Sequence, residues 1–192
     1  MRPVKGRWRK AQSLVEFTMV LPLVMTFALS IAEFGVAYGT NMSLIEATRE
    51  GARVGAVLGN GSGSLGCSGA TGSANVDPQI LLAVQRVLES PGSGIVMTTI
   101  DSVQIYNADT SAKDTYTYAP NSGTVCGATL DFLISGSAGW AASARSAAAP
   151  ADSLGVRIQY RYKMFTPLSA LTGLVGLNTI TMVDSTVMDI EP

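Results

Sequence analysis

The side chains that most often carry out chemistry in proteins are scarce or absent in this sequence. The chain has no histidine, so the commonest proton shuttle and metal ligand near neutral pH is missing. Serine–histidine and cysteine–histidine nucleophile pairs are excluded for the same reason, and two cysteines without histidine do not make a zinc site. There is also no glycine-rich phosphate loop followed by lysine and serine or threonine. The sequence therefore predicts no metal, no cofactor and no enzymatic activity.

The 14 acidic residues are scattered, and nothing marks two of them as the paired carboxylates of a sugar hydrolase. One of them, Glu16, stands out because it lies at the start of a long apolar run. An unpaired carboxylate near hydrocarbon costs on the order of a few kcal/mol. We therefore expect Glu16 either to have a partner or to face lipid headgroups at the membrane edge.

The apolar run has the length and the flanks of a membrane span. Residues 17–32 carry no charge, and with residues 34–38 they reach the roughly 20 residues needed to cross a bilayer. Basic residues precede the run with no acidic residue among them, as is typical of a cytoplasmic flank: Arg2, Lys5, Arg7, Arg9 and Lys10. We predict a basic leader at residues 1–11 and one span at about residues 17–39. A cleaved secretory signal is the alternative.

Helical patterning continues beyond the span, so residues 12–58 are expected to form one long helix. Apolar and small residues then recur at spacings of three and four, which is the pattern of a helix face that packs on a domain. That face consists of Leu44, Ile45, Thr48, Ala52 and Ala56. Glu33 is ambiguous in the same way as Glu16. It is expected near the outer interface, where its carboxylate reaches water without a partner, and the alternative is that it has a partner.

Two further groups on this helix leave alternatives open. The charged residues Arg49, Glu50 and Arg53 form either a solvated face or a surface that docks the domain onto its own helix. Small residues at four positions indicate either loose packing or the close approach of neighbouring helices. These positions are Gly35, Gly39, Gly51 and Gly55.

Residues 59–192 are expected to form an exported domain. A second helix is predicted from about Pro78 to Glu89, with Asp77 as its N-cap. Strands are predicted where β-branched residues are frequent, over Ile95–Tyr106, Val156–Lys163 and Thr179–Ile190. The remaining segments are read as an insertion with weak structure between Asn107 and Ser153, a short helix around Trp140–Ala148, and a buried connection over Leu171–Leu177. The predicted fold is α+β and pilin-like, with a long N-terminal membrane helix packed against a small antiparallel sheet and a second helix.

The only two cysteines, Cys67 and Cys126, lie in surroundings rich in glycine and serine. If the domain is exported, they are candidates for one disulfide. The alternative is two unrelated thiols, because sequence alone does not give the distance between them.

The segment from Ala11 to Phe17 resembles a prepilin processing site of the tight-adherence type. In that family a small residue precedes the cut, and glutamate and an aromatic residue follow as the fifth and sixth mature residues. Cleavage between Ala11 and Gln12 fits this count, with Glu16 and Phe17 in those two positions. Ala11 stands where the family usually has glycine.

A wider part of the chain is similar to the TadE-like family. The similarity is carried by four stretches, which are residues 12–17, 20–22, 31–35 and 47–53. It is weaker near the C-terminus, in residues 156–160 and 166–168 and at Met188. The resemblance implies a minor pilin or pseudopilin that takes part in assembly or priming of a tight-adherence, type IV-like pilus.

The same resemblance implies a location and a set of partners. The protein is expected in the bacterial cytoplasmic membrane as a single-pass protein with a cytoplasmic N-terminus, and incorporation into the pilus stays open. The implied partners are the membrane, other pilins or pseudopilins, the assembly machinery and a prepilin peptidase. Nucleic acid is not expected, since the net charge is −1.

The position of Glu16 leads to a mechanism for subunit registration. After removal of the leader, the new amine of Gln12 pairs with Glu16 of a neighbouring subunit, and the neutralised charges align adjacent helices. A runner-up function is a membrane-anchored extracytoplasmic binding domain that is not part of a pilus. A hydrolase that uses carboxylates is a third option, and it requires two acids to meet in a pocket.

Overall fold

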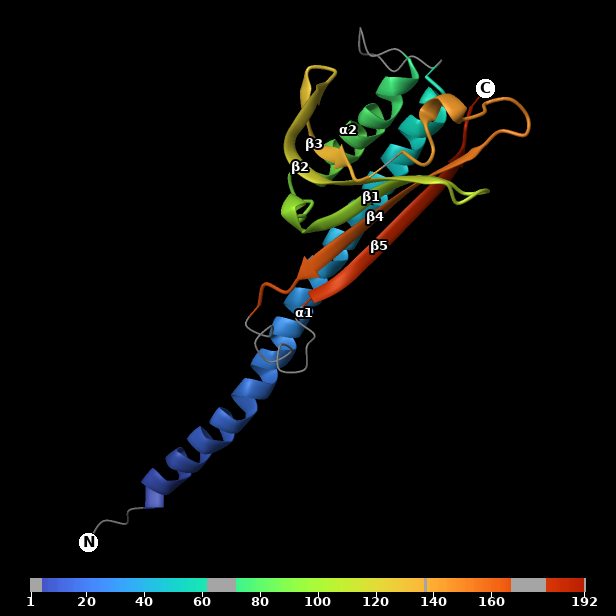
Figure 1. Ribbon diagram of the computed structural model, residues 1–192. Coiled ribbons are helices and arrows are strands. Elements are labelled where there is room, and N and C mark those ends of the chain that lie inside the picture. The colour runs from blue at the N-terminus through green and yellow to red at the C-terminus, as the bar shows by residue number, and fades with distance from the viewer. Residues whose placement is uncertain (1–4, 62–71, 137, 167–178, 192) are drawn as a thin grey trace. The chain divides into compact units, whose positions relative to one another are not determined.

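The computed structural model describes residues 5–61, 72–136, 138–166 and 179–191 (Figure 1). The two α-helices are α1 (Lys5–Leu58) and α2 (Val76–Leu88). The five strands are β1 (Ile100–Asn107), β2 (Lys113–Val125), β3 (Ala128–Ile134), β4 (Ser153–Lys163) and β5 (Thr179–Asp189). Short 3-10 helices occupy Ser73–Asn75, Met97–Thr99 and Ala142–Ala144. The chain is thus an α+β protein with a long N-terminal apolar helix, as predicted.

Helix α1 is continuous over 54 residues and includes Pro22. The predicted long helix is confirmed, although it begins earlier than residue 12. It ends at Leu58, and the next residue, Gly59, has a φ of 53°, in the left-handed region that favours glycine. The Gly59 amide donates a hydrogen bond of 2.9 Å to the carbonyl of Gly55, which satisfies one of the last free carbonyls of the helix.

The five strands form one antiparallel sheet in the order β3-β2-β1-β4-β5. Residue Val103 of β1 is opposite Tyr116 of β2 and Ile158 of β4, so β1 lies at the centre of the sheet. The prediction of weak structure between Asn107 and Ser153 is wrong, because β2 and β3 lie there. In β2 only two of 13 residues are buried, Asp114 and Tyr116, so the strand lacks the apolar alternation that would have revealed it.

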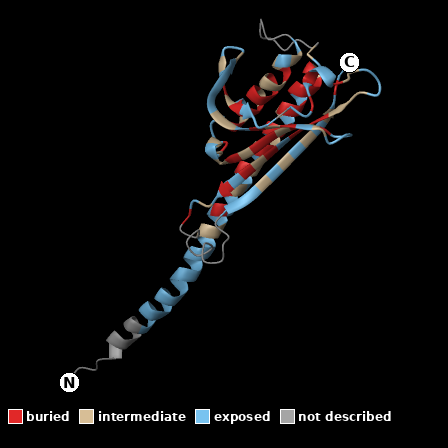
Figure 2. Ribbon diagram, in the orientation of Figure 1, coloured by how far each residue is buried: buried red, intermediate tan, exposed pale blue. Residues whose placement is uncertain are grey.

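Both helices cover the same face of the sheet, and the buried residues gather between them and the strands (Figures 1 and 2). Four of the five residues predicted for the packed face of α1 are buried, and Ile45 is half-buried. Glycine allows this close packing. A Cβ at Gly51 would lie 2.6 Å from Val84 Cγ2 of α2, and one at Gly55 would lie 2.6 Å from Leu154 Cδ2 of β4.

The start of α2 differs from its prediction. The N-cap is Asn75, and Asp77 lies inside the first turn instead of capping the helix. Its carboxylate is used elsewhere, in a buried ion pair described below. The short helix expected around Trp140–Ala148 is reduced to a single 3-10 turn.

The chain divides into two compact units. One consists of Met1–Ala37 and Lys163–Thr179, and the other of Tyr38–Tyr162 and Ile180–Pro192. The segment that follows β4 therefore belongs with the N-terminal part of α1, far from it in sequence. The buried connection expected over Leu171–Leu177 lies outside the described residues.

Candidate functional site

The four residues of the predicted processing and registration site lie together in the N-terminal part of α1. The Ala11–Gln12 peptide bond is inside the helix. The side-chain amide of Gln12 donates a hydrogen bond of 3.1 Å to Glu16 Oε1, and both side chains are exposed. Phe17 is 62% exposed. The carboxylate of Glu16 thus has a neutral partner one helical turn away, and its surface is free for a neighbour.

The following part of α1 presents large apolar side chains to the surroundings. Those exposed are Leu14, Val15, Phe17, Met19, Val20, Leu21, Leu23, Val24, Met25, Phe27, Ile31, Phe34, Val36 and Tyr38. The most apolar window of 18 residues has a mean hydropathy of 2.0, and none of it is buried. By length and composition, α1 is a helix that can cross a membrane, which suggests a single-pass membrane protein.

Glu33 breaks this apolar surface and is buried, with only 6% of its surface exposed. Its Oε1 accepts a hydrogen bond of 3.3 Å from the backbone amide of Phe165, and its Oε2 accepts one of 3.0 Å from that of Thr166. The expectation that this carboxylate reaches water without a partner is therefore wrong. The partners could not be found from sequence, because they are backbone groups more than 130 positions away.

The charged group on the outer part of α1 is solvated. Arg53 forms an ion pair of 2.6 Å with Glu50, one turn away, and both side chains are substantially exposed. The hydrogen bond from Arg53 holds the pKa of Glu50 below its usual value, and Glu50 in turn raises the pKa of Arg53. Arg49 is also exposed. The alternative in which these residues dock the domain onto the helix is not what the structure shows.

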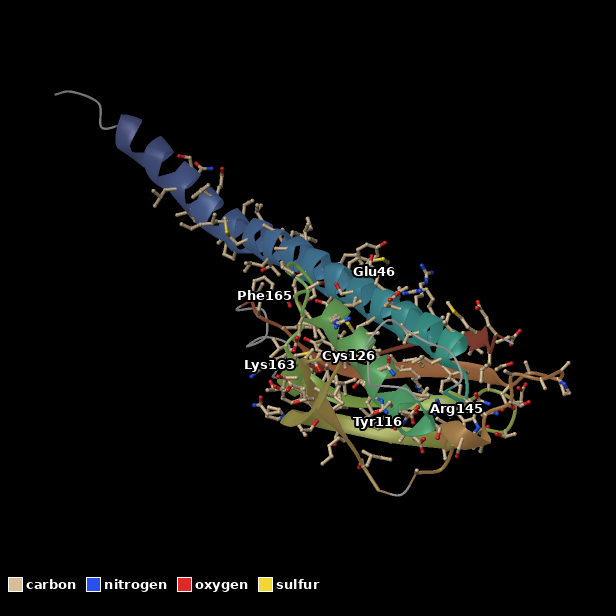
Figure 3. All side chains as sticks on the ribbon, turned by 90° about the horizontal axis from the view of Figure 1, so that it is seen from above. Glu46, Tyr116, Cys126, Arg145, Lys163 and Phe165 are labelled. Atoms are coloured by element: carbon tan, nitrogen blue, oxygen red, sulfur yellow. The ribbon has the colours of Figure 1, made fainter. Side chains whose placement is uncertain are left out.

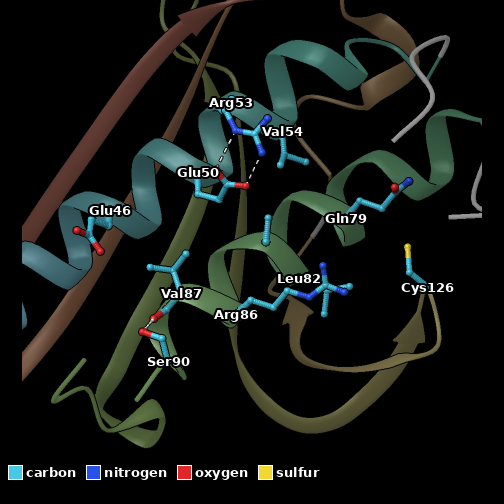
Figure 4. A pocket seen from close by; sticks show the side chains of 11 residues that line it. Glu46, Glu50, Arg53, Val54, Gln79, Leu82, Arg86, Val87, Ser90 and Cys126 are labelled. Carbon is cyan, nitrogen blue, oxygen red and sulfur yellow. Dashed lines mark hydrogen bonds and ion pairs between the residues drawn. The ribbon is translucent and has the colours of Figure 1, made fainter. Parts of the chain in front are cut away.

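A groove of about 820 Å³ runs between this part of α1 and α2 (Figure 4). Glu46, Glu50 and Arg53 line it from α1, and Arg86 lines it from α2. Its lining also includes Cys126, which follows β2 and is disulfide-bonded. Cys67 lies outside the described residues, so its pairing with Cys126 stays a prediction.

Residues 12–53, which carry the features described above, lie within a match to a known family. The family model for TadE-like proteins matches residues 11–53. This TadE-like segment covers about a fifth of the chain and includes the predicted cleavage site, Glu16, Glu33 and the Glu50–Arg53 pair. It suggests a protein associated with the tight-adherence pilus. No curated protein and no solved structure matches the chain.

Outside the TadE-like segment, the structure contains a buried polar network that the sequence analysis missed. Asp77 Oδ1 and Arg145 Nη2 are 2.6 Å apart, and the side chain of Arg145 is fully buried. The hydroxyl of Tyr116 donates a hydrogen bond of 2.9 Å to Asp77 Oδ2. The guanidinium carbon of Arg145 lies 4.6 Å from the ring centroid of Trp140, which is a cation–π contact. Nearby, Asp114 Oδ1 accepts hydrogen bonds from the backbone amides of Gly139 and Trp140.

Burial dominates the electrostatics of this network. It raises the pKa of Asp77, while the adjacent Arg145 acts in the opposite direction. Burial also raises the pKa of the Tyr116 phenol far above its usual value. The network joins α2, β2 and the segment before β4. Its only hint in the sequence is an arginine within an Ala- and Ser-rich stretch, and this gives no indication of a partner.

Side chains grouped as metal ligands are absent from the described residues. No group of three or more histidine, cysteine, aspartate or glutamate side chains that could hold a metal ion occurs in that part of the chain. The partly buried Asp77 is paired with Arg145, and the buried Asp114 accepts hydrogen bonds from two backbone amides. These contacts are those of a structural network.

Proposed function

We propose that this protein is a minor pilin or pseudopilin that takes part in assembly or priming of a tight-adherence pilus. The observation that carries the proposal is that two parts of α1 within the TadE-like segment differ in burial. The N-terminal part exposes apolar side chains, whereas Leu44, Thr48 and Ala52 of the same helix are fully buried in the domain core. A helix of this kind can anchor its subunit in a membrane and later pack against other helices by the same surface.

The proposal includes an orientation and a processing step. The leader at residues 1–11 lies in the cytoplasm, the span covers about residues 17–39, and residues 59–192 form the domain on the far side. A prepilin peptidase cuts between Ala11 and Gln12. The disulfide state of Cys126 supports an exported domain, because disulfides persist in oxidising compartments.

The proposed role of the mature N-terminus is to set the register between subunits. Cleavage creates a positively charged amine on Gln12, four residues from Glu16 in the same exposed stretch. In an assembly, the amine of one subunit replaces the neutral side-chain partner of Glu16 in its neighbour. The attraction between two opposite charges is stronger in a membrane-like environment than in water, since screening is weak there.

The first experiment is N-terminal sequencing with intact-mass measurement of the protein from its native membrane. A start at Gln12 is the expected result. The variant Ala11→Gly, which introduces the residue usual in the family, is expected to be cut at least as completely, and Ala11→Lys is expected to block cutting. A start at Met1 in both the parent and Ala11→Gly would contradict processing and favour a permanent membrane anchor.

The runner-up function, a membrane-anchored binding domain outside any pilus, has one observation in its favour. The groove between α1 and α2 carries exposed charges of both signs and is large enough for part of a partner protein. The two functions separate in one assay. If the protein is a pilus subunit, Ala11→Lys blocks processing and pilus assembly is lost. If it is an anchored binder, the same variant still binds its partner.

A further inference from the structure

The backbone that follows β4 is hydrogen-bonded to the Glu33 carboxylate of α1. Glu33 uses one oxygen for the amide of Phe165 and the other for the amide of Thr166. Glu33 and Thr166 are 6% and 4% exposed, whereas Phe165 between them is 63% exposed. The contact therefore hides the polar groups and turns the aromatic ring outward. All of these residues belong to the same compact unit of the chain.

This contact offsets two energetic costs that polar groups have at a membrane boundary. A carboxylate close to hydrocarbon is costly unless it is paired or hydrogen-bonded. Backbone amides that leave a strand also cannot enter an apolar environment without an acceptor. Each of the two hydrogen bonds has a charged acceptor, and such bonds are about twice as strong as neutral ones. The Glu33 contact thus lets a non-helical segment lie next to the apolar surface of α1.

The side chains around the contact match the chemistry of a lipid interface. Phe34, next to Glu33 in α1, is 73% exposed, and Phe165 adds a second exposed ring from the segment after β4. Lys163, at the end of β4, is exposed as well (Figure 3). Exposed aromatic rings sit at the boundary between headgroups and acyl chains, and a lysine at that depth extends its ammonium toward phosphate groups.

We propose that the segment Lys163–Thr166 is a second membrane contact, with Phe165 inserted into the headgroup–acyl boundary of the bilayer. Glu33 acts as the positioning residue that holds this segment at the end of the span. The inference rests on the proposed membrane span of α1, and it adds that the protein touches the bilayer through two parts of the chain. The partner is a lipid surface, since the exposed groups are two aromatic rings and one cation beside an apolar helix.

The test uses the full chain in lipid vesicles that contain phospholipids brominated on their acyl chains, which quench nearby tryptophan. All variants carry Trp8→Phe, and Trp140 stays as a constant background because it is only 6% exposed. Phe165→Trp is the reporter, and Leu133→Trp, an exposed apolar position on β3, is the matched control. We expect fluorescence at position 165 to fall about twofold with brominated lipid, with almost no change at position 133.

Two further variants show which part of the argument holds. Phe27→Trp reports on the span itself, and its quenching establishes that α1 is inserted. Combining Phe165→Trp with Glu33→Ala is expected to bring quenching at position 165 down to the control level, and Glu33→Gln is expected to give an intermediate value, because an amide oxygen accepts only part of the contact.

The outcomes are distinguishable. If position 27 is quenched and position 165 is not, the second membrane contact is wrong while the span stands. If neither is quenched, the proposed span fails first. If the emission at position 165 shifts to the blue with rising protein density in the membrane but does not respond to bromine, a second copy covers Phe165, and the lipid assignment is overturned.

Discussion

At the scale of single residues, the pair of the buried Arg145 and the partly buried Asp77 shows how a charge is kept inside this domain. Arg145 is held by the Asp77 carboxylate on one side and by the Trp140 ring on another. A buried ion pair is not by itself a source of stability, since desolvation offsets the attraction. Removing only one partner is strongly destabilising, because an uncompensated charge is left in the interior.

We therefore expect Arg145→Met to destabilise the domain by about 3–5 kcal/mol near neutral pH. The double variant Asp77→Leu with Arg145→Met should recover much of this loss, because no lone charge remains. Denaturant unfolding of the full chain in detergent, followed by circular dichroism, measures both. A double variant no more stable than Arg145→Met would show that packing, not charge, sets the cost.

The pH dependence of Arg145→Met follows from the same pair. Burial already raises the pKa of Asp77, and loss of the arginine removes the main effect that opposes the rise. A carboxyl whose pKa is higher in the folded state binds its proton more readily there, so stability increases as the pH falls. The defect of Arg145→Met should therefore be smaller at about pH 5 than at pH 8. A defect that is equal at both values would contradict an ionised Asp77 as its cause.

Glu16 gives the second prediction at this scale. Glu16→Gln removes the charge but keeps the hydrogen-bonding capacity toward Gln12. If the charge aligns subunits, incorporation of the variant into purified pili or pilus-associated complexes should fall severalfold, with membrane levels unchanged. Glu46→Gln is the matched control, since Glu46 is an exposed acid on the same helix. Quantitative immunoblotting of both fractions decides, and normal incorporation of Glu16→Gln means that the pairing does not occur.

At the scale of elements, the glycines of α1 separate into two classes that the sequence left open. Gly51 is packed so tightly that a Cβ would meet Val84 and Val156, whereas Gly35 and Gly39 have no atom within 4 Å of that position. Gly51 is therefore required by the close packing of α1 against α2 and β4 inside the domain. The pair Gly35 and Gly39 leaves the helix surface open to neighbours.

Gly51→Ala is accordingly expected to destabilise the domain by about 1–3 kcal/mol, because the β-branched neighbours Val84 and Val156 have little freedom to move. The same change at Gly35 is expected to be neutral or slightly favourable to the helix, since alanine is the better helix former. Thermal unfolding of both variants in the same detergent makes the comparison. Equal effects at the two positions would mean that the packing around Gly51 relaxes easily.

The elements that could be predicted carry a regular period of apolar residues or, like β1 and β5, are rich in β-branched residues. The amphipathic part of α1, helix α2 and strand β4 were predicted, because each buries a regular set of apolar side chains. Strand β2 could not be, since only Asp114 and Tyr116 of its 13 residues are buried, and β3 carries only a short alternation with Leu130 and Phe132 buried. The position of Glu33 was predicted near an interface, but its partners are backbone amides, which have no signature in the sequence.

At the scale of the whole molecule, the cysteines report on the compartment of the domain. If Cys67 and Cys126 pair, the loop that they close has close to 60 residues, and its loss should cost about 4 kcal/mol. Non-reducing peptide mapping of protein from native membranes is expected to recover the two cysteines in one linked peptide. The same mapping on protein that is retained in the cytoplasm by deletion of residues 17–32 should give free thiols. Linked cysteines in both samples would contradict the inference about compartment.

The C-terminal residues of the chain are hydrogen-bonded to α1 and to the residue before β4, which affects the order in which the domain can fold. The amide of Glu191 donates a hydrogen bond of 3.0 Å to the carbonyl of Ala56, and the amide of Ile190 donates one of 3.0 Å to Asp152. In the proposed topology, the part of α1 that crosses the membrane first meets its strand partners β4 and β5 only after nearly all of the chain has crossed. Because such distant contacts form slowly, the apolar face of α1 is expected to stay uncovered until the last strand arrives. Residues 44–58 are then the part of the helix that would be exposed to aggregation during that interval.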